Sequence, residues 1–256
     1  MKANGNHSAR RTAVEWILGL LMLGLVAGIQ MYIIEKPLLL EASAGIGTAG
    51  VNGDGNRESC VVLDAGHGAA DPGKVGCNQA NEKDINLSIV KKLKTALEKE
   101  KVRVVLTRES DEPLYQPDVP NKKMADMNRR IEIMEAASPD LVVSIHQNSY
   151  HDPSVCGPQV FYYHASEKGK RAAQLLQASF DEVDEMENRR KPKANDNYYL
   201  LLHTSMPMVI AECGFLSNPR EAELLIQDTY QEKIARALTK GILNYLNRNE
   251  TISYVF

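Results

Sequence analysis

Between residues 60 and 247 the chain alternates short apolar runs with longer segments in which apolar residues recur at helical spacing. Alternation predicts a strand over 158–164, and 198–202 has the pattern of a short strand or a turn. The spacing predicts helices over 83–99, 123–137 and 168–187 and helical segments over 219–247. Four runs rich in apolar, mostly β-branched residues have the length of buried strands: Cys60–Leu63, Val102–Leu106, Leu141–Ile145 and Met208–Ala211. This order predicts an α/β fold with a mostly parallel central sheet and helices on both faces.

The N-terminal segment has a different pattern. Trp16–Ile34 is almost continuously apolar and about long enough to cross a bilayer as a helix. The basic residues Lys2, Arg10 and Arg11 precede it, which by the positive-inside tendency places the N-terminus in the cytoplasm. We therefore predict a cytoplasmic tail and transmembrane anchor over 1–35, with the rest of the chain extracytoplasmic. The alternative is a signal peptide cleaved near Ala42-Ser43-Ala44, which would give a secreted protein.

A stretch rich in Gly, Ala, Ser and Asn follows the anchor and shows no hydrophobic period. It predicts a flexible linker over 36–58, followed by one folded catalytic domain over 59–249. The 256 residues are 43% hydrophobic and 25% charged, which is ordinary for a globular domain with a sizeable core. The net charge of −3 lacks the basic excess of a nucleic-acid-binding protein, so no nucleic-acid partner is expected.

The four cysteines have no C-x-x-C spacing, which argues against a zinc ribbon or a thioredoxin-like pair. Cys60 and Cys213 lie in apolar runs and are expected to be buried thiols. Cys77 and Cys156 lie in predicted loops, where a disulfide between them is permitted outside the cytoplasm.

Polar side chains follow several predicted strands where these strands end. The first strand continues into Asp64-Ala65-Gly66-His67-Gly68, the third into His146, and the last into Glu212. The functional crevice of an open parallel sheet lies at the carboxyl ends of its strands, so these groups are expected at one edge. Two imidazoles and a carboxylate there, without a nucleophile-elbow serine, favour a catalytic zinc site with one open position.

Such a site needs one acid as a ligand and a second acid as a base. Each acid near the predicted edge also has a structural explanation: for example, an acid can cap a turn, begin a helix or pair with an arginine. The residues alone leave this choice open among five candidates: Asp64, Asp71, Glu82, Asp84 and Glu212.

Five stretches occur in the order of a known family: Leu63–Gly68, Glu82–Leu87, Leu106–Arg108, Ser144–Asn148 and Glu212–Asn218. Together they resemble the zinc-dependent N-acetylmuramoyl-L-alanine amidases of the Amidase_3 family over about residues 60–246. Within this family the chain is most similar to the sporulation amidases, because an anchor precedes a bare catalytic domain and because of the sequence Asn197-Tyr198-Tyr199-Leu200-Leu201. The resemblance implies an α/β fold of the phosphorylase/hydrolase-like, amidase type.

The resemblance also implies roles for individual residues. His67, Glu82 and His146 match the family's zinc ligands, and Glu212 matches its catalytic acid. Asn148 and Arg130 fall at family-typical positions and are assigned to substrate binding. By the same comparison Asp64 becomes a supporting or turn residue, and Asp84 a residue of the helix start.

The implied substrate is peptidoglycan, cleaved between the lactyl group of N-acetylmuramic acid and L-alanine of the stem peptide. For a sporulation amidase this is spore-cortex peptidoglycan, where the bared muramic acid leads to muramic-δ-lactam. The chain has no cell-wall-binding repeat, so targeting rests on the anchor or on an accessory protein. Two alternatives stay open: a zinc carboxypeptidase-like hydrolase acting within the stem peptide, and a non-catalytic peptidoglycan-binding domain.

Overall fold

The structure is a computed structural model that describes residues 58–247. The predicted tail, the anchor at Trp16–Ile34 and nearly all of the linker lie outside the described residues and stay predictions. Among the helices of residues 58–247, none is long and apolar enough to cross a membrane.

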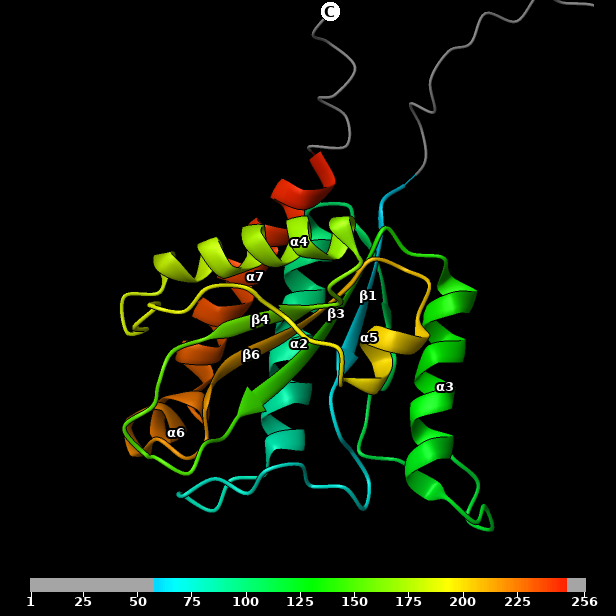
Figure 1. The fold of residues 1–256 in the computed structure, drawn as a ribbon, viewed down its shortest axis with the longest axis horizontal. Coiled ribbons are helices and arrows are strands. Elements are labelled where there is room, and N and C mark those ends of the chain that lie inside the picture. The colour runs from blue at the N-terminus through cyan, green and yellow to red at the C-terminus, as the bar shows by residue number, and fades with distance from the viewer. Residues whose placement is uncertain (1–57, 248–256) are drawn as a thin grey trace, which may run out of the picture. The chain divides into compact units, whose positions relative to one another are not determined.

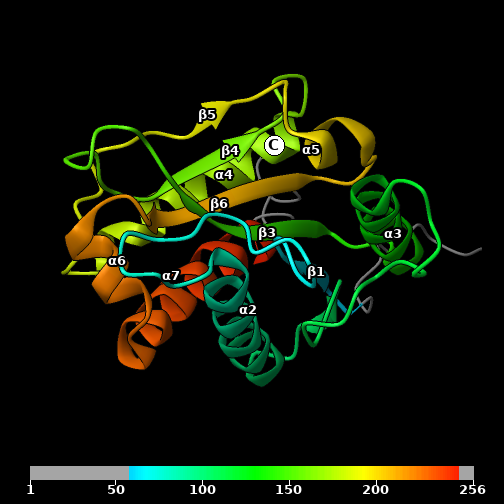
Figure 2. The same cartoon turned by 90° about the horizontal axis from the view of Figure 1, so that it is seen from below.

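A six-stranded sheet forms the centre of the described chain and carries helices on both faces (Figures 1 and 2). The strands are β1 (Cys60–Ala65), β2 (Arg103–Leu106), β3 (Leu141–Asn148), β4 (Gln159–Tyr162), β5 (Lys193–Ala194) and β6 (Met208–Phe215). The helices are α2 (Glu82–Lys99), α3 (Lys122–Ala137), α4 (Glu167–Ser179), α5 (Tyr199–His203), α6 (Pro219–Leu225) and α7 (Asp228–Asn247), with a 3-10 turn η1 (Phe180–Glu182) after α4. This arrangement confirms the predicted α/β class.

The strand order is β2-β1-β3-β6-β4-β5. The pairs β1–β2, β1–β3 and β3–β6 are parallel, so their carboxyl ends meet at one edge of the sheet. β4 is antiparallel to β6, and the short β5 pairs parallel to β4. The expected mostly parallel sheet is therefore present, with one antiparallel neighbour pair beside its centre.

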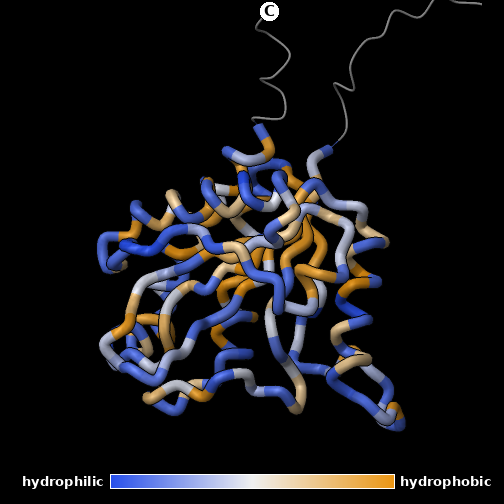
Figure 3. The backbone as a smooth tube through the Cα atoms, in the orientation of Figure 1, coloured by the Kyte–Doolittle hydropathy of each residue, from blue (hydrophilic) through white to orange (hydrophobic). Residues whose placement is uncertain are grey.

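Side chains of the strands alternate between two apolar layers. Val61 and Leu63 of β1 face the layer covered by α2, α4 and α7, whereas Val62 faces the layer covered by α3 and α5. Hydrophobic residues gather in the strands of the interior and recur along the helices, whereas the outer turns and loops are mostly hydrophilic (Figure 3). Because helices cover both faces of the sheet, we expect polar functional side chains at the edge where the carboxyl ends of the strands meet.

Two predicted elements differ from the structure. The helix expected over 168–187 stops at Ser179, because Asn188 returns to donate a hydrogen bond to the carbonyl of Gln177 (2.9 Å) in the last turn. The stretch 198–202, expected as a strand or turn, forms the short helix α5 instead. Leu200 and Leu201 are both buried, which is a helical pattern, since neighbours in a strand point to opposite faces.

The strands β3 and β6 run further than predicted. His146 lies inside β3, and Glu212 lies inside β6, so neither residue follows its strand as expected. The two are paired in register across the parallel ladder, and the register shifts between His146 and Asn148. No disulfide joins any of the four cysteines, so Cys77 and Cys156 are not bridged, while Cys60 and Cys213 are buried as predicted.

Candidate metal centre and active site

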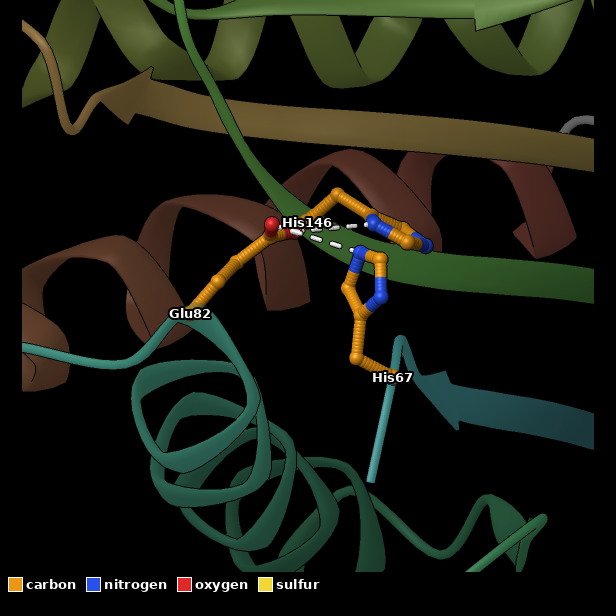
Figure 4. Close-up of side chains that lie close together, drawn as sticks. All are labelled: His67, Glu82 and His146. Carbon is orange, nitrogen blue, oxygen red and sulfur yellow. Dashed lines mark hydrogen bonds and ion pairs between the residues drawn. The ribbon is translucent and has the colours of Figure 1, made fainter. Parts of the chain in front are cut away.

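Three elements bring His67, Glu82 and His146 together at the carboxyl edge of the sheet (Figure 4). His67 stands in the loop after β1, Glu82 is the first residue of α2, and His146 lies on β3. Nε2 of His67 is 3.3 Å from Oε2 of Glu82, and Nδ1 of His146 is 3.0 Å from Oε1 of Glu82. One donor atom from each residue lies within 4.8 Å of the other two, so the three can hold one metal ion.

Glycine makes this approach of the three side chains sterically feasible. A Cβ on Gly66 would lie 2.2 Å from Cε1 of the His146 ring, and one on Gly73 would lie 2.6 Å from Oε2 of Glu82. Gly73 also has φ +66°, a conformation that favours glycine. His67 itself has φ +61°, so the backbone that presents its imidazole is held in a left-handed conformation.

Neighbouring groups orient the triad. Nδ1 of His67 lies 2.8 Å from Oδ2 of Asp71, which leaves Nε2 on the side of Glu82. This carboxylate–imidazole arrangement is the usual support of a metal-binding histidine. Glu82 is fixed by two backbone donors, since Oε2 accepts from the N–H of Lys74 (2.8 Å) and Oε1 from that of Gln147 (3.1 Å).

The protonation of the triad follows from its shared carboxylate. Burial alone would lower the pKa of His67, but the hydrogen bonds and charges of Glu82 and Asp71 outweigh it and raise that pKa to about 9. Burial likewise opposes the charged form of Glu82, yet hydrogen bonds to His146 and His67 hold its pKa far below the usual range. The pocket thus stabilises positive charge beside Glu82, which a metal cation can supply in place of protons.

Two buried arginines hold the loop that carries His67. Arg130 donates to the carbonyls of Ala65 (2.8 Å) and His67 (2.6 Å). Arg108 donates to the carbonyls of Ala65 (2.9 Å) and Gly66 (3.2 Å). These bonds go to three consecutive carbonyls, so the two guanidinium groups fix the loop in its unusual conformation.

Asp64 binds Arg130, one of the two arginines that hold the His67 loop. Its carboxylate is fully buried and accepts hydrogen bonds from Arg130 Nη1 (2.6 Å), Thr107 Oγ1 (2.6 Å) and Ser144 Oγ (2.5 Å). Burial would raise the pKa of Asp64, but the charge of Arg130 and the two hydroxyl donors outweigh it and lower that pKa to about 2. Asp64 is therefore charged at neutral pH and contacts the loop support, as the supporting role anticipates.

Glu212 lies on β6 beside the triad, opposite His146 in the β3–β6 ladder. The residue is only 6% exposed, and its Oε2 has no hydrogen-bond partner within residues 58–247. Burial raises the pKa of Glu212 to about 7, because the nearby His146 only partly compensates for lost hydration. A carboxylate with one unbonded oxygen and a pKa near neutrality is suited to take up and return a proton.

A cleft of about 780 Å³ runs over these residues. The predicted ligands, Glu212 and Asn148 line it together with residues of α3 and α5. Arg130 also lines the cleft, but it is only 2% exposed. Its guanidinium donates four hydrogen bonds to acceptors of the protein itself. Substrate contacts by Asn148 and Arg130 stay predictions, and Asp84 is an exposed first-turn residue of α2.

Arg108, Asn86 and Tyr198 contact residues of the site but were not predicted as part of it. Arg108 follows β2, so the rule that gathers polar groups at strand ends could have found it. Asn86 stands one turn after Glu82 on α2 and donates to it (3.3 Å), an i,i+4 relation that is visible in sequence. Tyr198 lies in the stretch Asn197–Leu201 that carries the resemblance to the sporulation amidases, but no spacing rule points to the site, because its place depends on the turn before α5.

A sequence family described as N-acetylmuramoyl-L-alanine amidase, Amidase_3, matches residues 61–244. The chain belongs to this amidase family. It is 35% identical over 190 residues to the germination-specific N-acetylmuramoyl-L-alanine amidase of Bacillus subtilis, covering 72% of this chain and 78% of the relative. It is 27% identical over 262 residues to the amidase AmiA of Escherichia coli, covering 84% of this chain and 85% of that relative. The amidase resemblance read from the five sequence stretches is thus confirmed.

Solved amidase structures share the fold. The CwlD amidase of Clostridioides difficile, in complex with the GerS lipoprotein, superimposes with a TM-score of 0.71 at 38% identity, covering 75% of this chain and all of that chain. The catalytic domain of CwlV from Bacillus (Paenibacillus) polymyxa gives a TM-score of 0.64 at 30% identity, covering 74% and 98%. The fold predicted from the family is therefore that of its solved members.

Proposed function

We propose that this amidase hydrolyses the amide bond between the lactyl group of N-acetylmuramic acid and L-alanine of the peptidoglycan stem peptide. The observation that carries the proposal is the position of Glu212, whose buried carboxylate lies in the same cleft as the His67–Glu82–His146 cluster. A proton-transferring acid beside a three-residue metal cluster is the arrangement that metal-assisted amide hydrolysis needs. Membership of the amidase family selects the muramoyl amide among the amides that such chemistry could cleave.

We propose zinc as the metal and His67, Glu82 and His146 as its ligands. Two imidazoles and one carboxylate form a donor set typical of catalytic zinc sites with an open position. The fit is supported by the Asp71 carboxylate behind His67 and by the two glycines that leave room for the ligands. Bound zinc would polarise the scissile carbonyl and acidify a water molecule.

Glu212 handles the proton in this proposal. Its carboxylate accepts a proton from the water whose oxygen forms a bond to the lactyl carbonyl carbon. As the carbon–nitrogen bond breaks, Glu212 returns that proton to the alanine nitrogen, which leaves as an amine. The burial that raises the pKa of Glu212 favours both transfers, because a base near neutral pKa can accept and release a proton at similar cost.

The biological setting is proposed from the relatives and the N-terminal sequence. The germination-specific relative and the CwlD neighbour support a role in spore-cortex maturation. The CwlD neighbour is in complex with a lipoprotein, which supports an accessory protein as a partner here. Trp16–Ile34 supports membrane anchoring with the catalytic domain on the extracytoplasmic side.

The test compares the chain with its Glu212→Gln variant on purified muramoyl-peptide. The variant is expected to bind zinc at the same stoichiometry and to lose about 10²- to 10⁴-fold in rate, the usual contribution of a general acid–base group. Glu98→Gln, on the exposed surface of α2, is the control and should keep both properties. Mass spectrometry should find a free lactyl carboxyl group and an alanine N-terminus. Cleavage within the stem peptide would favour the carboxypeptidase alternative, and an active Gln variant would reject the role of Glu212.

A further inference from the structure

The two oxygens of Glu212 have different surroundings. Oε1 accepts a hydrogen bond from the Tyr198 hydroxyl at 3.4 Å, whereas Oε2 is buried without a partner within residues 58–247. No other side chain of the described residues donates a hydrogen bond to this carboxylate. A phenol therefore holds one oxygen of the proposed proton-transfer group, and this is the hydrogen bond through which a neighbouring side chain can orient the carboxylate.

One ring contact and one backbone hydrogen bond fix Tyr198. It packs edge-to-face on Phe161 of β4, with ring centroids 5.5 Å apart and planes at 90°. Its backbone N–H donates to Oδ1 of Asn195 (3.0 Å), which fixes the turn before α5. Phe161 lies on β4, which is paired with β6, the strand of Glu212, so the phenol ring packs on the strand next to the one that carries the carboxylate.

A phenol is a suitable hydrogen-bond donor to the Glu212 carboxylate. A neutral donor stabilises a carboxylate less than Arg or Lys would, so the carboxylate keeps the basicity that proton transfer needs. Burial and the charge of Glu212 raise the pKa of Tyr198 above its usual value, so the hydroxyl stays protonated at neutral pH. The 3.4 Å distance is long for a hydrogen bond, as catalytic hydrogen bonds often are before substrate binds.

We propose that Tyr198 is a positioning residue of the amide hydrolysis: its hydroxyl holds Oε1 of Glu212 and so orients the carboxylate that takes the proton of the attacking water and returns it to the leaving nitrogen. Tyr198 keeps its own proton throughout, and no bond to it forms or breaks. The inference rests on the proposed function, since it gives Glu212 the proton-transfer role. It adds which side chain orients the carboxylate of Glu212.

Tyr198→Phe tests the inference, because it removes the hydroxyl and keeps the ring that packs on Phe161. The expected result is a fall in kcat of about 10- to 100-fold, the range for a hydrogen bond to a charged group. KM, zinc content and melting temperature should be unchanged. The acidic limb of the pH profile should move to higher pH, because the lost bond favoured the charged carboxylate.

Tyr245→Phe is the matched control. It removes a hydroxyl that makes a similarly long hydrogen bond, 3.5 Å to the carbonyl of Asp140, just before β3 at the opposite edge of the sheet. Its kcat and pH profile should equal those of the unaltered chain. A Tyr198→Phe variant with unchanged kcat, or with only KM raised, would overturn the positioning role, and the second result would make Tyr198 a substrate contact.

A spectroscopic measurement separates this inference from the proposed function. The infrared carboxylate band that disappears in Glu212→Gln reports the hydrogen bonding of Glu212. In Tyr198→Phe that band should shift, whether or not the chain hydrolyses muramoyl-peptide. An unshifted band overturns the inference, whereas a shifted band in a chain without amidase activity would retain the hydrogen bond and reject the proposed function.

Discussion

The buried ion pair between Asp64 and Arg130 makes a quantitative prediction. Asp64→Asn keeps the shape of the side chain but removes its charge. Asn presents an N–H₂ group where one donor, Arg130, Thr107 or Ser144, now finds a carboxylate oxygen. We expect the change to destabilise the fold and to loosen the loop that carries His67.

The magnitude follows from the surroundings of the carboxylate. Lowering the pKa of Asp64 from 3.8 to about 2 corresponds to about 2 kcal/mol of stabilisation of the charged folded state. Removing one partner of a buried pair costs about 3–5 kcal/mol, because the other charge stays buried. Arg130 keeps Asp126 as a second, partly exposed partner, so we expect about 3 kcal/mol, or roughly 6–12 °C in melting temperature for a domain of this size.

The stability that the Asp64 carboxylate contributes depends on pH. Since folding lowers the pKa of Asp64, its contribution is complete above about pH 4 and is lost as the pH falls toward 2. Urea unfolding of the metal-free chain between pH 7 and pH 3 measures this contribution to stability. Far-ultraviolet circular dichroism follows the unfolding in place of tryptophan fluorescence, because the single tryptophan lies at position 16, outside the described residues. The difference between the two chains should shrink at the acid end. Equal stability at pH 7, or parallel curves down to pH 3, would refute the reasoning.

Three further predictions concern the metal and the frame around it. Gly66→Ala places a methyl group against the His146 ring and should lower zinc affinity at least about 10- to 100-fold, measured by chelator competition; unchanged affinity would mean that the ring can move aside. Glu221→Ala should cost about 2–4 kcal/mol in thermal unfolding, because the buried N–H groups of Gly157 (2.8 Å) and Phe215 (2.7 Å) lose their acceptor. A stable variant would show that water replaces the carboxylate. Removing the metal from a sample in which the free metal ion is at about 100 times its Kd should lower the free energy of unfolding by about 2.7 kcal/mol. An unchanged free energy of unfolding would mean that metal binding does not stabilise the fold.

Much of the fold was readable from the sequence, because most elements are long or strongly patterned. The helix expected over 83–99 begins one residue earlier, at Glu82, and the strand expected over Cys60–Leu63 extends to Ala65. The end of α4 was not readable, because it depends on Asn188 folding back onto the helix. The two-residue strand β5 carries no pattern, since its pairing with β4 is a tertiary event.

The candidate site was readable in part. The rule that parallel strands deliver polar groups to one edge placed His67, His146 and Glu212 together, and the structure brings them together there. The same rule could not rank Glu82, which comes from a helix start, so that assignment came from the family resemblance. The strand-end rule could have found Arg108, whereas the support that Arg130 gives to the loop was beyond a single sequence, because its side chain reaches the loop from α3 through the folded interior.

The position of β6 has a consequence for the order of events after synthesis. β6 is the last strand in the chain, yet it lies between β3 and β4 in the sheet. A chain that is still emerging from the ribosome therefore contains all three predicted metal ligands before β6, the strand that carries Glu212, has been synthesised. We expect hydrolytic competence to arise only when the sheet closes around its final strand. A chain truncated before β6 would then hold the metal ligands but lack hydrolytic activity.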